Sequence, residues 1–338
     1  MISRRFAPLV FVAFAWLPGP AGAAPCATAT PACTEWIGLR AGSARSLVYR
    51  NVPLTVRNEA VTRALVVVHG QGRDADNYFR SALAAAFLAG ALEDTVIIAP
   101  RFASNAGSCR DVLSADEVNW ACSGQSWRSG AAAVNQKTLT SYDFMDTLLT
   151  LVARKDTFPN LKSIVLTGHS AGGQYVSRYA MANLVHDTLG VPVKYVVSNP
   201  SSYGYPDANR PTEDGKGFKA FDDARNCTTY DRWPYGFNDR VGYAAQLTDQ
   251  QLTKQLVTRP TVYLLGELDI LPLAGFDSSC PAMAQGPTRL ARGQAFAAYM
   301  AERYSAPHHT VVQVPLCGHN ARCMYTAEIA LPILFPAK

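Results

Sequence analysis

The segment from Ser163 to Gly173 constrains the fold more than any other part of the chain. It reads Ser-Ile-Val-Leu-Thr-Gly-His-Ser-Ala-Gly-Gly, so an apolar run rich in β-branched residues ends in a G-x-S-x-G motif. The run predicts a strand, and the residues that follow predict a helix from Ala171 to His186. Gly168 and Gly172 leave room for a sharp turn, because a Cβ at either position would crowd the neighbouring backbone. Ser170 is therefore predicted to be exposed at a sheet edge, where it can act as a nucleophile.

Short apolar runs alternate with amphipathic stretches in the rest of the chain, which is typical of a mainly parallel sheet covered by helices. The predicted strands are Ser46–Leu54, Ala64–His69, Thr95–Pro100, Ser163–Thr167, Lys194–Asn199, Thr261–Leu265 and Thr310–Pro315. The predicted helices are Asn77–Leu92, Ser141–Ala153, Ala171–His186, Thr288–Tyr304 and Ala327–Leu334. The chain is therefore predicted to have an α/β fold with helices on both faces of the sheet.

Two long polar stretches, 103–140 and 200–259, interrupt this alternation and contain many tyrosines and tryptophans. Loops of this length usually carry function or small elements of their own. We predict that both cross the carboxyl edge of the sheet, where open α/β folds bind ligands, and that 200–259 forms a lid or cap. Their aromatic side chains would either line an aromatic or sugar-bearing pocket or simply pack the long loops.

The N-terminal residues have the three parts of a signal peptide. A pair of arginines precedes the apolar run from Phe6 to Leu17, and a small-residue cleavage site follows at Ala21-Gly22-Ala23. The apolar run is too short to span a membrane, and no later stretch is long enough. We therefore predict a signal peptide at 1–23, a single domain at 24–338, and a secreted or periplasmic protein.

The charge balance gives no reason to expect a nucleic-acid partner. The chain has 31 lysines and arginines and 26 acidic residues, so removing Arg4 and Arg5 leaves 29 against 26, a net charge of +3. No basic run with interleaved aromatic residues is present, and a mixed, solvated surface accounts for this composition.

Eight cysteines follow the predicted signal peptide, and an even number in an exported chain indicates four disulfides. They are Cys26, Cys33, Cys109, Cys122, Cys227, Cys280, Cys317 and Cys323. Many connectivities are possible, although short loops favour 26–33, 109–122 and 317–323, which leaves 227–280. Zinc binding is the competing interpretation, but the cysteine spacings contain no C-x-x-C pair.

A catalytic serine requires a base that accepts its proton and an acid that orients the base. His319 is predicted to be the base, because it alone among the six histidines follows the last predicted strand. Asp269 is predicted to be the acid, since it ends the Gly-Glu-Leu-Asp sequence after the preceding strand. Glu267 is its nearest rival, and Asp207 is a weaker alternative.

Acyl transfer also requires hydrogen-bond donors for the oxyanion. The backbone N–H of Ala171, directly after the nucleophile, is one predicted donor, and that of Gln71 is the other. Gln71 lies between two glycines that allow the backbone to turn its amides inward. This Gly-Gln-Gly segment lacks the third glycine of a dinucleotide-binding loop, so a nucleotide cofactor is not expected. His69 is predicted to support the loop from behind.

Taken together, four segments resemble the α/β-hydrolase superfamily. They are His69-Gly70-Gln71-Gly72, Gly168-His169-Ser170-Ala171-Gly172, Gly266-Glu267-Leu268-Asp269 and Gly318-His319. The resemblance covers nearly the whole mature chain, and it implies a mainly parallel eight-stranded sheet and a Ser-Asp-His triad. Because only seven strands are predicted, one edge strand, before Ser46, is missing. The cysteine usage is also similar to that of secreted serine esterases.

We therefore predict a secreted serine hydrolase that cleaves small or polymer-borne carboxylic esters through an acyl-enzyme. No metal or cofactor is expected. One alternative is an exported serine peptidase or amidase on the same scaffold. A second is a non-catalytic binding protein that has kept the fold, because function depends on the site and not on the scaffold.

Overall fold

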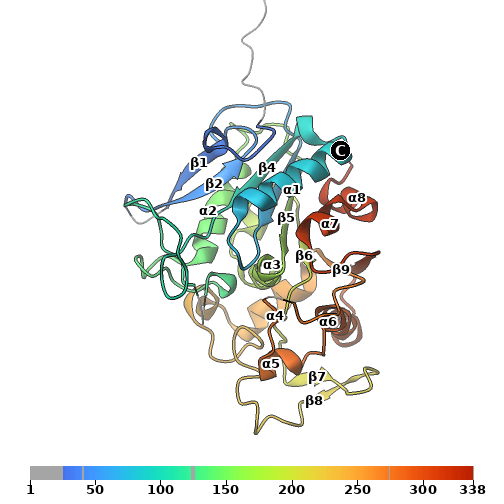
Figure 1. The fold of residues 1–338 in the computed structure, drawn as a ribbon. Helices are drawn as coiled ribbons and strands as arrows, with labels where there is room; N and C mark the ends of the chain where they lie inside the picture. The colour runs from blue at the N-terminus through green and yellow to red at the C-terminus, as the bar shows by residue number, and fades with distance from the viewer. Residues whose placement is uncertain (1–25, 40–41, 123–125, 274, 338) are drawn as a thin grey trace, which may run out of the picture.

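A computed structural model describes residues 26–39, 42–122, 126–273 and 275–337 and is shown in Figure 1. The predicted signal peptide lies outside the described residues. An eight-stranded sheet forms the centre of the molecule. Its strands, in spatial order, are β1 (Thr34–Gly38), β2 (Arg45–Arg50), β4 (Thr95–Pro100), β3 (Arg63–Val68), β5 (Ser163–His169), β6 (Val193–Ser198), β9 (Thr261–Gly266) and β10 (His309–Val314).

The predicted architecture is confirmed. Strand β2 runs antiparallel to β1 and β4, and all other neighbouring strands are parallel. The edge strand missing from the seven predicted ones is β1, which precedes Ser46. Strands β3 and β4 are buried on both faces, which explains why their sequences are continuous apolar runs without alternation.

Helices cover both faces of the sheet (Figure 1). One apolar core contains side chains of α1 (Ala75–Leu88), α7 (Ala321–Thr326) and α8 (Leu331–Leu334). The other contains side chains of α2 (Ser141–Val152), α3 (Ala171–Ala182), α4 (Asp249–Thr258) and α6 (Arg289–Tyr304). The short helix α5 (Cys280–Met283) and the hairpin of β7 (Asn209–Pro211) and β8 (Phe218–Ala220) lie at the bottom of the view.

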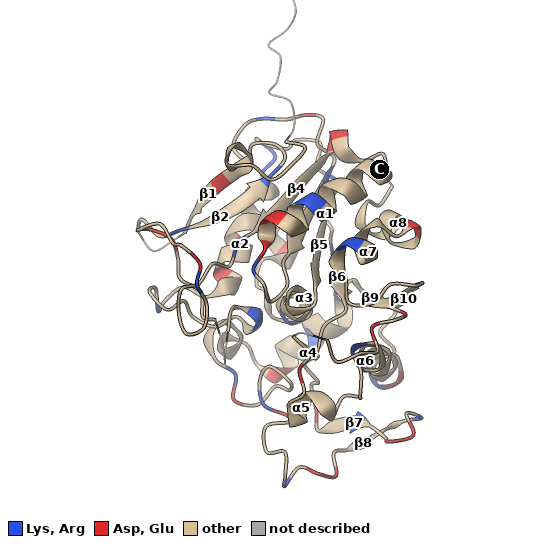
Figure 2. Cartoon of the chain, viewed as in Figure 1, with Lys and Arg blue, Asp and Glu red and all other residues tan. Residues whose placement is uncertain are grey.

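Single 3₁₀ turns complete the described structure. They are Pro31–Cys33, Leu92–Asp94, Trp127–Ser129, His186–Thr188, Gly242–Gln246 and Glu328–Ala330. None of the described helices is long and apolar enough to cross a membrane. Figure 2 shows basic and acidic residues distributed over many elements and not gathered on one face.

Three predicted helices have the wrong bounds. The helix predicted at Asn77–Leu92 is α1, which begins at Ala75 and ends at Leu88, before Gly90 adopts a positive φ of 62°. Helix α3 ends at Ala182 and not at His186, because Asn183 adopts an extended conformation and its side chain bonds back to a helix carbonyl. The predicted helix Ala327–Leu334 is instead a 3₁₀ turn followed by α8. Pro332 lies in the first turn of α8, where its missing N–H breaks no helical hydrogen bond.

The 200–259 stretch is more ordered than its polar sequence suggests. Its last part forms α4, whose Leu252 and Leu256 pack in the same core as α3. Most of its aromatic side chains are also buried in that core, namely Tyr203, Tyr205, Trp233, Phe237 and Tyr243. The packing interpretation of these aromatics therefore holds for most of them. Tyr235 is only half-buried, and together with Trp233 it borders a cavity.

All eight cysteines form disulfides, and the pairing is the one that the short loops favoured. The bonds join Cys26 to Cys33, Cys109 to Cys122, Cys227 to Cys280 and Cys317 to Cys323.

Candidate active site

Ser170 lies in the sharp turn between β5 and α3, as the motif predicts. Its φ of 60° and ψ of −119° place a non-glycine residue in a rarely populated backbone region. The turn is possible because its glycines lack side chains. A Cβ on Gly168 would come within 2.3 Å of the Gly172 carbonyl oxygen, and a Cβ on Gly172 within 2.2 Å of the Val68 carbonyl oxygen. The local sequence thus fixes both the strain and the position of the serine.

Ser170, His319 and Asp269 come together at the carboxyl edge of the sheet, although the sequence separates them widely. The Nε2 atom of His319 lies 2.9 Å from the Oγ of Ser170, and its Nδ1 lies 2.7 Å from the Oδ2 of Asp269. The loops after β5, β9 and β10 supply one side chain each. Asp269 is 1% exposed, Ser170 9% and the His319 side chain 10%, so the Asp269 end of this hydrogen-bonded chain is the end best shielded from water.

The two rival carboxylates are bonded elsewhere. The Oε2 of Glu267 accepts the backbone N–H of Leu316 at 3.0 Å. Asp207 lies 3.5 Å from a guanidinium nitrogen of Arg303. Asp269 is therefore the carboxylate that contacts the histidine, in agreement with the G-x-x-D prediction.

Asp269 has a second buried partner that the sequence did not reveal. The Nη1 of Arg289 lies 3.5 Å from its Oδ1, and the Nε of Arg289 donates to the Oγ of Ser201 at 2.8 Å. Burial lowers the pKa of Arg289, and the nearby Asp269 opposes this shift. An arginine in the first turn of a helix normally faces water, so no pattern in the sequence marks it as a partner of Asp269.

His169, the residue before Ser170, lies behind His319. Its ring is buried with its centroid 4.5 Å from that of His319, and burial holds its pKa well below the usual range of histidine. The Tyr78 hydroxyl lies 3.3 Å from its Nδ1, and the Asn199 amide nitrogen lies 3.4 Å from its Nε2. His169 is therefore a neutral group held between two polar side chains.

Asn199 also ties two loops of the site together. Its Oδ1 accepts the N–H of Gly266 at 2.8 Å, and its Nδ2 donates to the carbonyl of Gly318 at 3.3 Å. Because Gly266 ends β9 and Gly318 precedes His319, one amide connects the loops that carry Asp269 and His319. Its place after β6, at the sheet edge shared with Ser170, is the signal that could have identified it.

The two predicted oxyanion donors lie close to Ser170. Gln71 and Ser170 line the same cavity, and Ala171 is the first residue of α3. Neither the Gln71 nor the Ala171 N–H donates to a backbone or side-chain acceptor in the part of the chain that the structure describes. His69 supports the loop as predicted, because its Nδ1 lies 2.8 Å from the Gly70 carbonyl oxygen. Burial lowers the pKa of His69 to about 4, so it is neutral.

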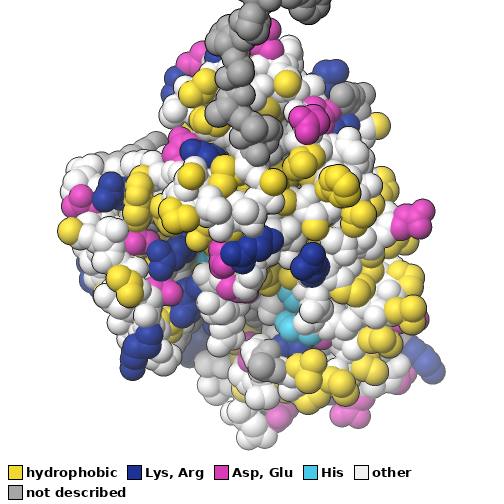
Figure 3. Space-filling model, turned by 45° about the horizontal axis from the view of Figure 1, so that its top comes forward, with side chains coloured by type: hydrophobic (Ala, Val, Ile, Leu, Met, Phe, Trp, Pro, Cys, Tyr) yellow, Lys and Arg dark blue, Asp and Glu magenta, His cyan; other side chains and the backbone are white. Residues whose placement is uncertain are grey.

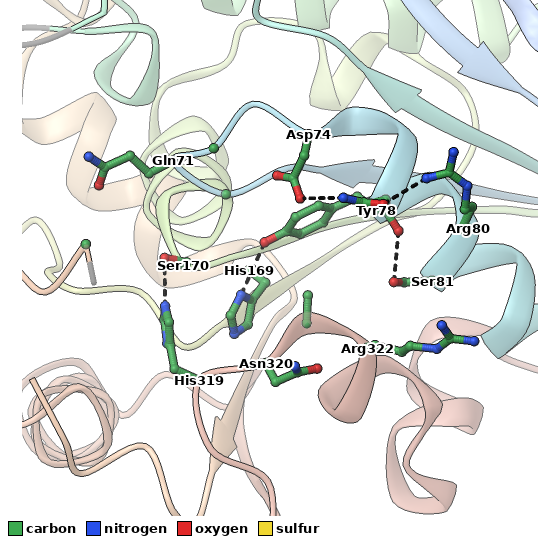
Figure 4. A pocket seen from close by; sticks show the side chains of 15 residues that line it. Gln71, Asp74, Tyr78, Arg80, Ser81, His169, Ser170, His319, Asn320 and Arg322 are labelled. Carbon is green, nitrogen blue, oxygen red and sulfur yellow. Dashed lines mark hydrogen bonds between the residues drawn. The ribbon is translucent and has the colours of Figure 1, made fainter. Parts of the chain in front are cut away.

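A cavity of about 670 Å³ opens at Ser170. Figure 4 shows His319 pointing at Ser170 on one side, with Gln71 on the opposite loop and Tyr78 behind. Arg80 and Arg322 lie farther out along the same cavity. Seen from outside, histidine atoms are visible in a hollow of the surface that has hydrophobic side chains beside it (Figure 3). Among the described residues, no group of three or more His, Cys, Asp or Glu side chains could hold a metal ion.

The Cys317–Cys323 bond joins two residues six positions apart, and His319 lies in the loop between them. Asn320, inside this loop, caps α7 by accepting the N–H of Cys323 at 3.0 Å. We expect replacement of both cysteines by serine to lower kcat much more than it lowers the melting temperature. A short loop contributes little chain entropy, whereas misplacing a catalytic group by about 1 Å can cost about a hundredfold in rate.

Kinetics and thermal unfolding of the C317S/C323S double variant measure both quantities. The C26S/C33S variant is the matched control, because that bond closes a separation of seven residues away from the site and should leave kcat unchanged. A kcat within about twofold of wild type in C317S/C323S would contradict this role of the bond.

The fold and the arrangement of the site are those of an α/β hydrolase. The chain belongs to the alpha/beta hydrolase family, whose sequence profile matches residues 65–329. A search of curated protein sequences found no match.

Two solved structures resemble the chain over most of its length. LpqC, a poly(3-hydroxybutyrate) depolymerase from Bordetella parapertussis, is 20% identical, with 88% of this chain and 86% of that chain covered and a TM-score of 0.60. Poly(aspartic acid) hydrolase-1 from Sphingomonas sp. KT-1 is also 20% identical, with 89% and 98% covered and a TM-score of 0.59. At this level of identity the likeness shows the shared fold.

Proposed function

We propose that the protein is a secreted serine hydrolase that cleaves carboxylic esters. One observation carries the proposal, namely the hydrogen-bonded chain from Asp269 through His319 to the strained Ser170. This is the order and geometry in which a carboxylate orients a histidine and the histidine accepts a serine proton.

In the proposed mechanism, Ser170 Oγ attacks the ester carbonyl carbon while His319 Nε2 takes the serine proton. Asp269 holds the Nδ1–H and stabilises the imidazolium that forms. The N–H groups of Gln71 and Ala171, with the positive end of α3, bind the tetrahedral oxyanion. The C–O bond to the alcohol then breaks, and His319 protonates the departing oxygen. Water attacks the acyl-enzyme by the same route, releasing the acid and restoring Ser170. No step of this sequence requires a metal or cofactor.

The surroundings of the site support an ester with an apolar part, either a small molecule or a polymer. Five aliphatic side chains next to Asp269 and His319 in the sequence are 48–80% exposed, namely Leu268, Ile270, Leu271, Leu273 and Leu316. A set of exposed aliphatic side chains such as this one is common where a protein binds an apolar ligand. The resemblance in fold to a poly(3-hydroxybutyrate) depolymerase is compatible with a polymer-borne ester.

The alternative is a serine peptidase or amidase, since the same triad can cleave amides. Matched ester and amide substrates with one acyl group distinguish the two. Faster turnover of the amide than of the ester, after correction for their intrinsic reactivity, would overturn the ester proposal. Labelling by a fluorophosphonate at Ser170 would also dismiss a non-catalytic binding protein, whereas an unlabelled serine in folded protein would dismiss the serine hydrolase.

Ester hydrolysis is expected to be lost in acid, because a protonated His319 imidazole cannot accept the Ser170 proton. Burial holds the pKa of the adjacent His169 well below its usual range, so that imidazole is still neutral in mild acid. One protonation should therefore govern the acidic limb of a plot of kcat/KM against pH. A rate that stays flat down to about pH 4 would contradict a histidine base.

We further propose that residues 1–23 direct export and that the mature chain is one domain from residue 24, with 200–259 as its cap. The four disulfides support export, because such bonds persist in oxidising compartments. Mass spectrometry of the protein from culture medium or periplasm tests the cleavage site. A mature chain that still carried residues 1–23 would contradict it.

A further inference from the structure

A second cavity of about 630 Å³ lies on the α3 side of the nucleophile. Gln174 and Arg178, which line it, are one and two helical turns beyond Ser170, so they lie about 6 and 12 Å from it along the helix axis. Gly275 lines the cavity that opens at Ser170, and Asp277, two residues later, lines the second one. The second cavity is therefore close enough for a substrate bound at Ser170 to extend into it.

Two arginine side chains are the distinctive feature of this cavity. Arg178 is 2% exposed and Arg128 is half-buried, and both line the cavity. In the part of the chain that the structure describes, neither guanidinium has a carboxylate oxygen within ion-pair distance. A buried guanidinium without an ionic partner is costly, because its desolvation is not offset by an opposite charge. Burial accordingly lowers the pKa of Arg178 to about 10, which still leaves it charged at neutral pH.

Neutral groups hold these two side chains in position. Arg128 Nη1 donates to the Oε1 of Gln174 at 3.2 Å, and Gln174 Nε2 donates to the Oγ of Ser202 at 2.7 Å. Arg178 Nη2 donates to the same Oγ at 2.9 Å, and its Nε donates to the Pro234 carbonyl at 3.2 Å. The Nη1 of Arg178 donates to no residue that the structure describes. The network orients the two cations without neutralising them.

The nearest acid does not supply the missing partner. Asp277 also lines the cavity and is close enough to raise the pKa of both arginines, but it forms no ion pair with either of them. Oδ2 accepts the Tyr235 hydroxyl at 2.7 Å, and Oδ1 accepts the Ser279 hydroxyl at 2.6 Å. Arg232, also on the wall of the cavity, is paired with Asp239 at 3.1 Å. The cavity thus keeps two oriented guanidinium groups available to an anion.

We propose that Arg128 and Arg178 bind a carboxylate carried by the substrate, so that the enzyme favours half-esters of dicarboxylic acids over neutral esters of the same length. This inference rests on the proposed ester hydrolysis and adds the charge of the substrate to it. Guanidinium groups suit carboxylates because their planar N–H pairs match the two oxygens. The separation of about 12 Å between Arg178 and Ser170 along the helix axis corresponds to an acyl chain of several methylene groups.

Two substrates with equal acyl chains test the proposal, namely mono(4-nitrophenyl) suberate and 4-nitrophenyl octanoate, which differ in one terminal carboxylate. The kcat/KM for the suberate ester divided by that for the octanoate ester should be about tenfold or more lower in R128Q than in wild type. A loss of this size is expected when one hydrogen bond between charged groups is removed. R154Q is the control, because Arg154 is exposed and paired with Asp156 away from both cavities, and its ratio should match wild type. An R128Q ratio equal to that of wild type would overturn the proposal.

Binding to an inactive protein separates this inference from the proposed function. Monomethyl suberate should bind S170A more tightly than dimethyl suberate does, and S170A/R128Q should lose that difference in isothermal titration. S170A/R178Q should lose the same difference; if the R178Q substitution prevents folding, R178K keeps the charge and should weaken the bidentate contact. If S170A binds monomethyl suberate through Arg128 but the wild-type protein hydrolyses neither nitrophenyl ester, the carboxylate site is upheld and the proposed function is overturned. If the wild-type protein hydrolyses the octanoate but S170A shows no preference for monomethyl suberate, the proposed function is upheld and the carboxylate site is overturned.

Discussion

Replacing Ser170 by alanine is expected to lower kcat for ester hydrolysis by about three orders of magnitude or more while the protein folds normally. The substitution removes the Oγ that lies 2.9 Å from His319, and with it the atom that forms the acyl-enzyme. Alanine keeps the Cβ of serine, so the backbone strain at φ 60° is unchanged and only the hydroxyl group is lost. The activity that is left would come from substrate binding and the oxyanion donors.

Steady-state kinetics and thermal unfolding of S170A measure these two effects. S163A is a suitable control, since Ser163 begins the same strand at the opposite end from Ser170 and should retain full activity. A kcat of S170A within about tenfold of wild type would mean that another group is the nucleophile.

The Asp269→Asn substitution is expected to lower kcat by about four orders of magnitude, far more than Glu267→Gln. The Asp269 carboxylate is a charged acceptor for the Nδ1–H of His319, whereas an asparagine amide presents either an N–H donor or a neutral oxygen. An amide donor favours the tautomer with the proton on Nε2, which cannot accept the Ser170 proton. Glu267 instead accepts the N–H of Leu316, and a glutamine oxygen can still do so. Kinetics of the two variants at one pH decide the order, and a slower E267Q would assign the acid to Glu267.

Asp269→Asn should also lower the melting temperature, in contrast to S170A. The carboxylate is 1% exposed and faces the buried guanidinium of Arg289, so its replacement leaves that cation without a charged partner. The kinetics should therefore be measured well below the unfolding transition. If D269N were as stable as wild type and only inactive, the contact with Arg289 would contribute little to folding.

The fold and the three-residue core of the site were predictable from local sequence. The strands are short apolar runs, and the glycines around Ser170 leave few alternatives to a sharp turn. Asp269 and His319 could be placed because each follows a strand of a parallel sheet, and the carboxyl ends of such strands share one edge.

The supporting groups were not predictable, because their roles depend on contacts between distant elements. Arg289 pairs with Asp269 only after α6 packs beside β9, and Arg178 faces a cavity only because the segment around Pro234 crosses α3. The C-terminal helix was misjudged because its apolar residues satisfy a helical pattern on both sides of the break before Pro332. Periodicity identifies a buried face, but it does not identify the residue packed against it.

The short bond that brackets His319 has a practical consequence for anyone who prepares this enzyme. A bacterial cytosol keeps thiols reduced, so protein made there would have Cys317 and Cys323 as free thiols. The other three disulfides would be reduced as well, but both apolar cores are built from the sheet and its helices, so we expect the secondary structure seen by circular dichroism to be retained. Because the Cys317–Cys323 bond lies nearest the reacting groups, the specific activity of such a batch would then follow the oxidation state of that bond more than the fraction of folded protein. Active-site titration, paired with a thiol count, is the measure by which two preparations can be compared.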